Sequence, residues 1–278
     1  MIIDKYAPIG VFDSGVGGLT VVRELMRNLP QENIVYFGDT ARVPYGNKSK
    51  ETVLRYSRQI IRFLETKDVK AIVVACNTAS ALAMDTIEKE INIPIIGVVI
   101  PGVHTALRTT RNNRIGVIAT DSTIKSNLYQ TLLRSNNSEI TVFGKACPLF
   151  VPLVEEGWTK DRITYEIACR YLDDVLDKDI DTLIMGCTHY PLMRSLLKKV
   201  VGDDVTLVNP AYETSVALKK LLEDLNLQNP GDFVKEKKFQ CGRYRFFASD
   251  AVERFNTFAD TVLPCEVESA ELVQIEDF

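Results

Sequence analysis

The chain has 278 residues, of which 46% are hydrophobic and 25% charged, and its 33 basic and 37 acidic side chains leave a formal net charge of −4. This composition is typical of a globular protein that buries a sizeable core. The sequence contains no basic cluster of the kind that binds nucleic acid, and no apolar run of the roughly 20 residues that a membrane helix needs. We therefore expect neither a nucleic-acid partner nor a membrane anchor.

Short runs rich in valine and isoleucine alternate along the chain with segments of helical period. In chain order, we predict strands at residues 9–12, 33–37, 71–75, 95–99, 115–119, 141–143, 182–185 and 244–248. The predicted helices are residues 20–29, 49–65, 79–91, 123–133, 160–176, 191–200 and 251–262. Strands that are apolar throughout and separated by helices are typical of a parallel sheet covered on both faces. The sequence therefore predicts an α/β fold.

Two parts of this pattern resemble each other. Residues 68–78 (DVKAIVVACNT) align with residues 179–189 (DIDTLIMGCTH). This alignment matches Cys76 with Cys187, which lies 111 positions further along the chain. Upstream, residues 9–14 and 34–39 resemble the segments that lie 106 positions further on. Collinear matches indicate an internal repeat rather than the general similarity of apolar strands.

The repeat predicts two similar α/β lobes, related by a pseudo-twofold axis, each with a parallel sheet flanked by helices. We expect residues 1–98 and 211–278 to form the first lobe and residues 99–210 the second. On this prediction the active site lies in the cleft between the lobes.

The six cysteines form no Cys-x-x-Cys pair, and with only two histidines the chain has no zinc motif of the usual spacing, so we predict no metal site. The first residues do not resemble a signal peptide, so we expect a cytoplasmic protein with free thiols. We expect four of these thiols, Cys147, Cys169, Cys241 and Cys265, to be packing residues.

Polar residues follow five of the predicted strands at their carboxyl ends, where ligands bind in parallel α/β sheets. These clusters are Asp13-Ser14, Asp39-Thr40, Cys76-Asn77-Thr78, Thr120 and Cys187-Thr188-His189. Because serine, threonine, aspartate and asparagine favour helix N-caps, capping explains Thr78 and Thr120 when each is taken alone.

Cysteine is not a favoured cap, so Cys76 and Cys187 need another explanation. Each follows an apolar strand and precedes a predicted helix, whose N-terminus lowers the pKa of a thiol from about 8.5. Since the two cysteines occupy equivalent places in similar lobes, we expect two reactive thiols that face each other across one site. His189, two residues after Cys187, is suited to hold or accept its proton.

The glycine-rich segment at residues 13–20 (DSGVGGLT) does not match a nucleotide-binding motif. The third glycine of a dinucleotide fingerprint would fall at Thr20, and the chain has no P-loop sequence. The segment instead predicts a tight turn whose backbone N–H groups can face a small anion such as a carboxylate.

Together, the segments GVFDSGVGGLTV, GDTARVPYG, VVACNTASA, CPLFVPLVEEG and LIMGCTHYPL resemble those of glutamate racemase, in the aspartate/glutamate racemase family. The resemblance covers most of residues 9–215 and weakens after residue 225. It implies an enzyme that interconverts L-glutamate and D-glutamate without a cofactor and supplies D-glutamate for peptidoglycan. It also implies a homodimer.

The resemblance implies roles for individual residues. Cys76 would act on D-glutamate and Cys187 on L-glutamate, as the two groups that exchange the α-proton from opposite faces. Asp13 would assist Cys76, Glu155 and His189 would assist Cys187, and Asp39 would be a more distant assistant. The implied substrate contacts are Asp13, Ser14, Tyr45, Gly46, Asn77, Thr78, Thr120, Thr188 and His189.

Two alternatives stay open from the sequence. One is an aspartate racemase, or a related isomerase or decarboxylase of a small dicarboxylate in the same superfamily. The other is a small-molecule binding protein on the same fold, in which the thiols only line a pocket. Matched thiols disfavour the binding protein, because binding needs only one set of contacts.

Overall fold

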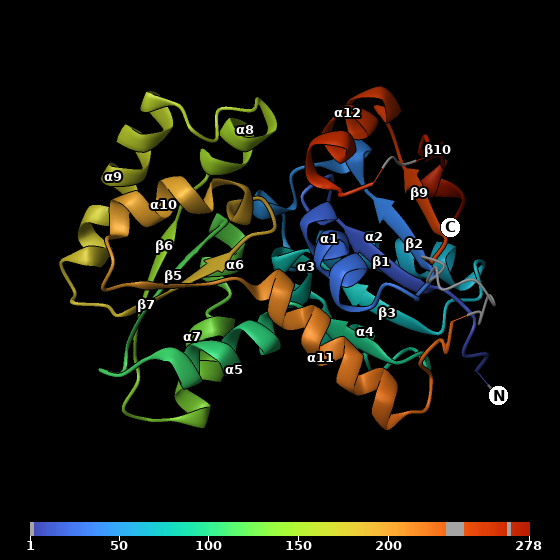
Figure 1. Ribbon diagram of the computed structural model, residues 1–278, viewed down its shortest axis with the longest axis horizontal. Helices are drawn as coiled ribbons and strands as arrows, with labels where there is room; N and C mark the ends of the chain where they lie inside the picture. The colour runs from blue at the N-terminus through green and yellow to red at the C-terminus, as the bar shows by residue number, and fades with distance from the viewer. Residues whose placement is uncertain (1–2, 232–241, 266–267) are drawn as a thin grey trace, which may run out of the picture.

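A computed structural model describes residues 3–231, 242–265 and 268–278, and within these residues helices alternate with strands that form two separate sheets (Figure 1). One sheet contains β1 (Ile9–Asp13), β2 (Ile34–Gly38), β3 (Ala71–Val74), β4 (Ile95–Gly97), β9 (Tyr244–Ala248) and β10 (Glu271–Leu272). The other contains β5 (Arg114–Ala119), β6 (Thr141–Ala146), β7 (Thr182–Gly186) and β8 (Thr206–Val208).

The helices of the first part of the chain are α1 (Leu19–Asn28), α2 (Lys50–Glu65), α3 (Asn77–Leu82), α4 (Met84–Ile87), α5 (Val99–Thr109), α6 (Asp121–Lys125) and α7 (Leu128–Asn136). Those that follow are α8 (Phe150–Glu155), α9 (Arg162–Leu176), α10 (Arg194–Val201), α11 (Pro210–Asp224) and α12 (Val252–Val262). Short 3-10 helices are η1 (Thr40–Arg42), η2 (Tyr45–Asn47), η3 (Tyr190–Met193) and η4 (Ile275–Asp277). In the part of the chain that the structure describes, no helix has both the length and the apolar character to span a membrane.

The two sheets share one strand order. The first is ordered β10-β9-β2-β1-β3-β4 and the second β6-β5-β7-β8, and every pairing in both is parallel. When β1 is matched with β5, the strands β2, β3 and β4 fall on β6, β7 and β8. The prediction of two similar parallel sheets flanked by helices is therefore confirmed, and β9 and β10 extend the first sheet at one edge.

The central strands are buried from end to end, as their apolar sequences require. Alternate residues of β1 enter different cores: Ile9 and Val11 belong to the core on one face of the sheet, and Phe12 belongs to the core on the other. Helices therefore cover both faces, and polar side chains are left to the ends of the strands.

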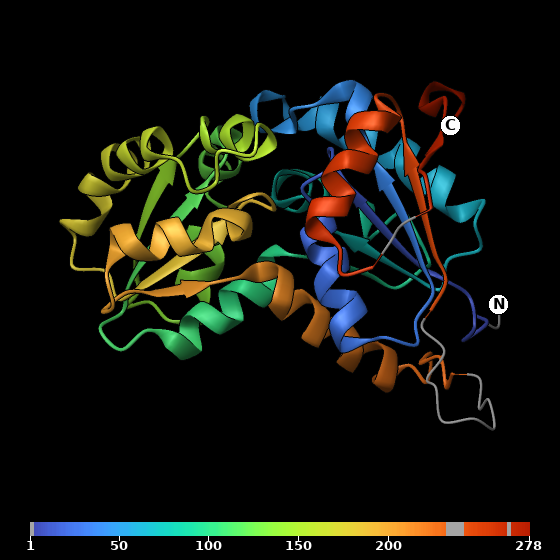
Figure 2. The same ribbon diagram turned by 45° about the horizontal axis from the view of Figure 1, so that its top comes forward.

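The chain leaves the first sheet after β4 and returns to it after β8. Helices α5 and α11 lie at these two crossings and pack against each other (Figure 2). The side chain of Asn209 caps α11 by accepting a hydrogen bond from the backbone N–H of Ala211 at 3.1 Å.

Several predicted boundaries are wrong in detail. The helix predicted at residues 79–91 is two short helices, α3 and α4, and the one predicted at residues 123–133 is interrupted at Asn127, whose φ is 56°. The strand predicted at residues 95–99 ends at Gly97, because Val99 already belongs to α5. Strands β8 and β10 have only three and two residues, too few to show a period.

Of the four cysteines expected to pack in a core, only Cys147 is fully buried among those described. Cys169 is half-buried, and Cys265 is exposed, so the prediction is wrong for Cys265. Cys241 lies outside the described residues.

Candidate active site

A cavity of about 440 Å³ is lined by the segments that follow β1, β2 and β3 of the first sheet and β5, β6 and β7 of the second. These six segments meet because parallel strands end at the same edge of each sheet, and the two edges face one another. A volume of this size is in the range of small-molecule sites. The cavity thus lies between the two sheets, where the repeat predicts the active site.

Most of the predicted site residues line this cavity. They are Ser14, Tyr45, Gly46, Cys76, Asn77, Thr78, Thr120, Glu155, Cys187, Thr188 and His189. Asp13 and Asp39 do not line it, since both are completely buried behind its wall. The sequence analysis missed Gly15, Val43, Pro44, Asn47, Asp121, Pro148, Val151 and Pro152. All but Asp121 lie within or next to the segments that carry the family resemblance, but several are apolar and gave no chemical signal.

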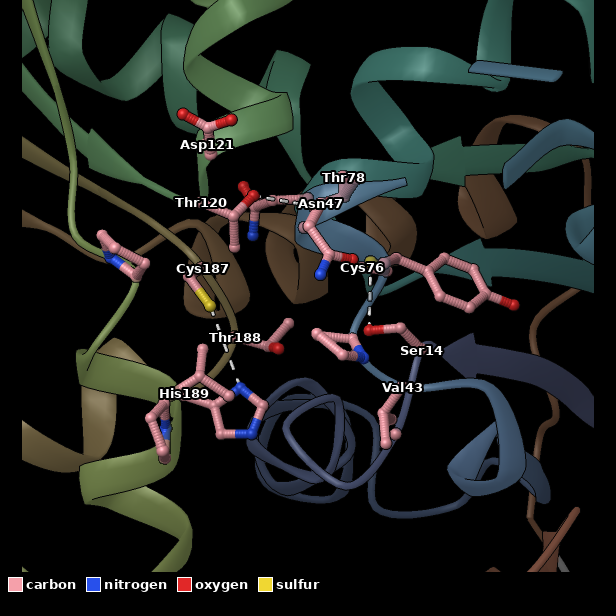
Figure 3. A pocket seen from close by; sticks show the side chains of 18 of the residues that line it. Ser14, Val43, Asn47, Cys76, Thr78, Thr120, Asp121, Cys187, Thr188 and His189 are labelled. Carbon is pink, nitrogen blue, oxygen red and sulfur yellow. Dashed lines mark hydrogen bonds between the residues drawn. The ribbon is translucent and has the colours of Figure 1, made fainter. Parts of the chain in front are cut away.

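Cys76 and Cys187 lie on opposite sides of the pocket (Figure 3). Cys76 follows β3 and Cys187 follows β7, the third strand of each repeat. Both thiols are buried, with 5% and 6% of each residue exposed. The equivalence seen in the sequence therefore places two thiols face to face across one cavity.

On its own side, Cys76 has neutral hydrogen-bond partners. Its thiol donates to Ser14 Oγ at 3.5 Å, and its sulfur accepts from the backbone N–H of Ala79 at 3.4 Å, at the start of α3. Burial, together with the negative charge of Asp13, raises the pKa of Cys76 to about 12. The backbone N–H of Ala79 at the start of α3 lowers this pKa as expected, but burial and Asp13 outweigh it, so the predicted net lowering is wrong.

Asp13 lies behind Cys76 at the end of β1. Its Oδ2 accepts a hydrogen bond from the backbone N–H of Gly18 at 2.9 Å. Burial raises the pKa of this carboxyl, against the lowering effects of His189 and of backbone N–H groups. Asp13 is therefore placed to act on Cys76 through its charge.

The Cys187 side carries a chain of ionisable groups. Cys187 Sγ lies 3.8 Å from His189 Nδ1, and His189 Nε2 lies 3.0 Å from Glu155 Oε1, at the end of α8. Burial lowers the pKa of His189, but hydrogen bonds to Cys187 and Glu155 outweigh it and raise the pKa to about 10. Burial likewise opposes the charge of Glu155, yet His189 holds the pKa of that carboxyl below its usual range.

No helix begins directly at Cys187, contrary to the sequence prediction. The 3-10 helix η3 begins at Tyr190, after His189. Cys187 therefore does not lie at a helix N-terminus, and its thiol faces the His189 imidazole instead.

Segments from the two sheets touch closely around the cavity. A β-carbon at Gly17 would collide with Thr188 and with the His189 ring, so only glycine fits there. Thr20 Oγ1 donates to the backbone oxygen of Thr188 at 2.8 Å, and the hydroxyls of Thr78 and Thr120 lie 2.9 Å apart. These contacts join the segments of the two sheets next to the cavity.

Asp39 supports the wall of the cavity rather than its interior. Its carboxylate accepts hydrogen bonds from Arg42 Nε at 2.8 Å, from Ser249 Oγ at 2.9 Å and from the hydroxyl of Tyr45. Tyr45 belongs to the segment that lines the cavity. Asp39 therefore acts by holding Tyr45 in place.

Within residues 3–231, 242–265 and 268–278, no three histidine, cysteine, aspartate or glutamate side chains gather as metal ligands.

Comparisons with known proteins agree with this fold. The model of the family described as Asp/Glu/Hydantoin racemase matches residues 9–214. The chain therefore belongs to the Asp/Glu/hydantoin racemase family, a class of isomerases.

Relatives within this family are more specific. A glutamate racemase of Neisseria meningitidis is 46% identical over 274 residues, which cover 98% of both chains. The structure of a glutamate racemase isoform from Bacillus anthracis has a TM-score of 0.91 and 38% identity, and covers 97% of this chain and 98% of that one. The structure of glutamate racemase from Francisella tularensis in complex with D-glutamate has a TM-score of 0.90 and 39% identity, over 99% of this chain and 100% of that one. The chain is thus a member of the glutamate racemases, as the resemblance of its motifs implies.

Proposed function

We propose that the protein interconverts L-glutamate and D-glutamate with Cys76 and Cys187 as the two acid–base groups and without a cofactor. The observation that carries the proposal is the placement of these two buried thiols on opposite sides of one cavity. Inversion at the α-carbon needs a base on one face and an acid on the other. The bound D-glutamate of the Francisella tularensis enzyme supports glutamate as the substrate.

In the direction from L- to D-glutamate, Cys187 is the base. A protonated imidazole next to a thiol favours the thiolate, and His189, with a pKa of about 10, is protonated at neutral pH. The Cys187 thiolate takes the α-proton, and the electron pair of the broken C–H bond stays on the α-carbon. Cys76, whose pKa of about 12 keeps it protonated, then donates its proton to the opposite face. The reverse reaction begins with a Cys76 thiolate and a Cys187 thiol.

The carbanion formed between the two steps needs stabilisation by the surrounding dipoles. The described lining residues include no lysine or arginine, and His189 is paired with Glu155, so we expect hydroxyls, amides and backbone N–H groups to bind the substrate carboxylates. The hydroxyls come from Ser14, Thr78, Thr120 and Thr188, and the amide of Asn77 is oriented by the hydroxyl of Tyr129 at 2.7 Å. Such fixed dipoles stabilise charge strongly in a cavity that excludes water.

The test is a side-by-side incubation of the protein with L-glutamate and with L-aspartate in D2O, followed by chiral chromatography and mass spectrometry. We expect deuterated D-glutamate and a much slower reaction with L-aspartate. Faster conversion of L-aspartate would support the aspartate racemase alternative. If neither substrate is inverted and neither takes up deuterium, the result would support the alternative of a small-molecule binding protein.

We further propose that the enzyme works in the cytoplasm, where it supplies D-glutamate for peptidoglycan. We also propose that residues 1–98 with 211–278, and residues 99–210, form the two lobes. The membership of the strands supports this division, since β1–β4, β9 and β10 form one sheet and β5–β8 the other. Partial proteolysis followed by mass spectrometry tests it, because cleavage is expected to concentrate at the crossings.

The final part of the proposal is a homodimer. Helices α5 and α11 pack against each other and leave Ile100, Tyr212 and Val216 between 45% and 53% exposed. Large apolar side chains gathered on neighbouring helices favour association with a second copy. Light scattering after size-exclusion chromatography should give the mass of a dimer, and that of a monomer in a Tyr212→Glu variant.

A further inference from the structure

Helix α12 lies beside the first sheet (Figure 1), and two of its side chains contact the Cys187 side of the cavity. It follows β9 of the first sheet, whereas Glu155, which ends α8, follows β6 of the second. The guanidinium of Arg254 on α12 lies 3.4 Å from Glu155 Oε2 and 3.4 Å from Glu156 Oε1. One turn further along α12, the ring of Phe258 packs at 6.2 Å from the ring of His189. The helix therefore touches both groups that lie behind Cys187.

We propose that Arg254 is a positioning residue for the Cys187 half of the site. It holds Glu155 against His189, and through them it keeps the imidazole directed at Cys187. This inference rests on the proposed function of Cys187 as an acid–base group.

Each oxygen of the Glu155 carboxylate has its own side-chain partner. Oε1 pairs with His189 and Oε2 with Arg254, and no other side chain among the described residues bonds to it. Glu155 is the last residue of a helix of only six residues, and Gly157 follows with a φ of 78°. Since helix α8 is short and the chain turns sharply after it, we expect the orientation of the carboxylate to depend on its two side-chain partners.

We expect Arg254 to affect the orientation of the Glu155 carboxylate more than the stability of the fold. Its side chain is 62% exposed, and exposed ion pairs contribute little to stability. A variant at this position should therefore fold normally. Its effect should be confined to the Cys187 half, because Cys76 bonds to Ser14 and Ala79, whereas Arg254 pairs with Glu155 and Glu156.

Overall rates alone cannot distinguish the two halves of the site. L- and D-glutamate are enantiomers of equal free energy, so kcat/KM must be the same in both directions for any variant. A deuterium at the α-carbon does distinguish them, because it moves only in the first proton transfer. That transfer goes to Cys187 from L-glutamate and to Cys76 from D-glutamate.

The experiment compares Arg254→Gln with the unmodified enzyme, using L- and D-[2-2H]glutamate. We expect kcat/KM to fall by about 3- to 10-fold in both directions, as for a group that acts through another. The isotope effect from L-[2-2H]glutamate should rise, and that from D-[2-2H]glutamate should fall toward 1. Arg254→Lys, which keeps the charge, should restore much of both values.

Arg245→Gln is the matched control. Arg245 is exposed to a similar extent, at 51%, and pairs with Glu271 at 2.8 Å, away from the cavity. Unchanged kinetics in Arg254→Gln, or isotope effects that both move in the same direction, would overturn the inference while the unmodified enzyme still racemises glutamate. If the unmodified protein does not exchange the α-proton, the proposed function itself fails.

Discussion

The two halves of the cavity occupy matching places in sheets of one strand order, yet they surround their thiols differently. Cys76 meets a serine hydroxyl and a backbone N–H, with a buried carboxyl behind it. Cys187 faces an imidazole that is paired with a carboxylate. The repeated fold therefore places the thiols, while the unrelated loops around them give each thiol different partners.

The largest expected effect comes from removing either thiol. Cys76→Ala and Cys187→Ala should each lower racemisation by about 100- to 10,000-fold, the contribution of a general acid or base. Circular dichroism of an L-glutamate solution measures the loss. Cys169→Ala, which changes a half-buried thiol away from the cavity, is the control and should retain full activity. Near-normal racemisation by either cysteine variant at the site would show that the two halves are not both needed.

The next effect concerns the contact between the halves. Gly17→Ala should push the glycine-rich turn away from Thr188 and His189, since the added methyl group collides with both. We expect a loss of about 10- to 100-fold in kcat/KM, in line with the sensitivity of reactions to small misplacements. Gly144→Ala, whose added methyl group would make only ordinary contact with Ile124, tests whether loss of a glycine alone matters. Equal activity of Gly17→Ala and the unmodified enzyme would mean that the halves need not touch.

A smaller pair of effects distinguishes the halves by their partners. His189→Gln should raise the isotope effect from L-[2-2H]glutamate, whereas Ser14→Ala should raise that from D-[2-2H]glutamate. The reason is that each change slows proton transfer at its own cysteine. Initial-rate assays with the labelled and unlabelled forms of both enantiomers give these isotope effects. Identical isotope patterns in the two variants would contradict the assignment of separate partners.

The smallest effect is on stability and depends on pH. The pKa of His189 rises from 6.5 to about 10 on folding, so its contribution to stability is complete below pH 6.5 and is lost as the pH rises through 10. The pKa of Cys76 rises from 9.0 to about 12, so this thiol contributes no pH dependence below pH 9. Between pH 6.5 and 9, denaturant titration should therefore show a decline in the free energy of unfolding that Cys76→Ala retains and His189→Gln reduces. A decline of equal size in both variants would assign it to other groups.

Much of the fold and of the site could be predicted because it depends on local sequence. The strand ends at Asp13, Cys76 and Cys187 follow from apolar runs, and the repeat shows that the two cysteines are equivalent. What could not be predicted depends on distant packing. Arg254 contacts Glu155 across 99 positions of sequence, and no periodicity of α12 indicates that contact. The pKa of Cys76 differs from the prediction because burial, which the strand-end position does not reveal, outweighs the short helix.

The most direct measurement of the two-thiol mechanism is the early time course of L-glutamate racemisation in D2O. Before much product forms, we predict that nearly all D-glutamate carries one deuterium at the α-carbon, while the remaining L-glutamate stays unlabelled. This result follows if one thiol removes the proton and the opposite thiol, exchanged with solvent, supplies a deuteron. Early D-glutamate that retains its original proton, or L-glutamate that gains deuterium as fast as product forms, would contradict it.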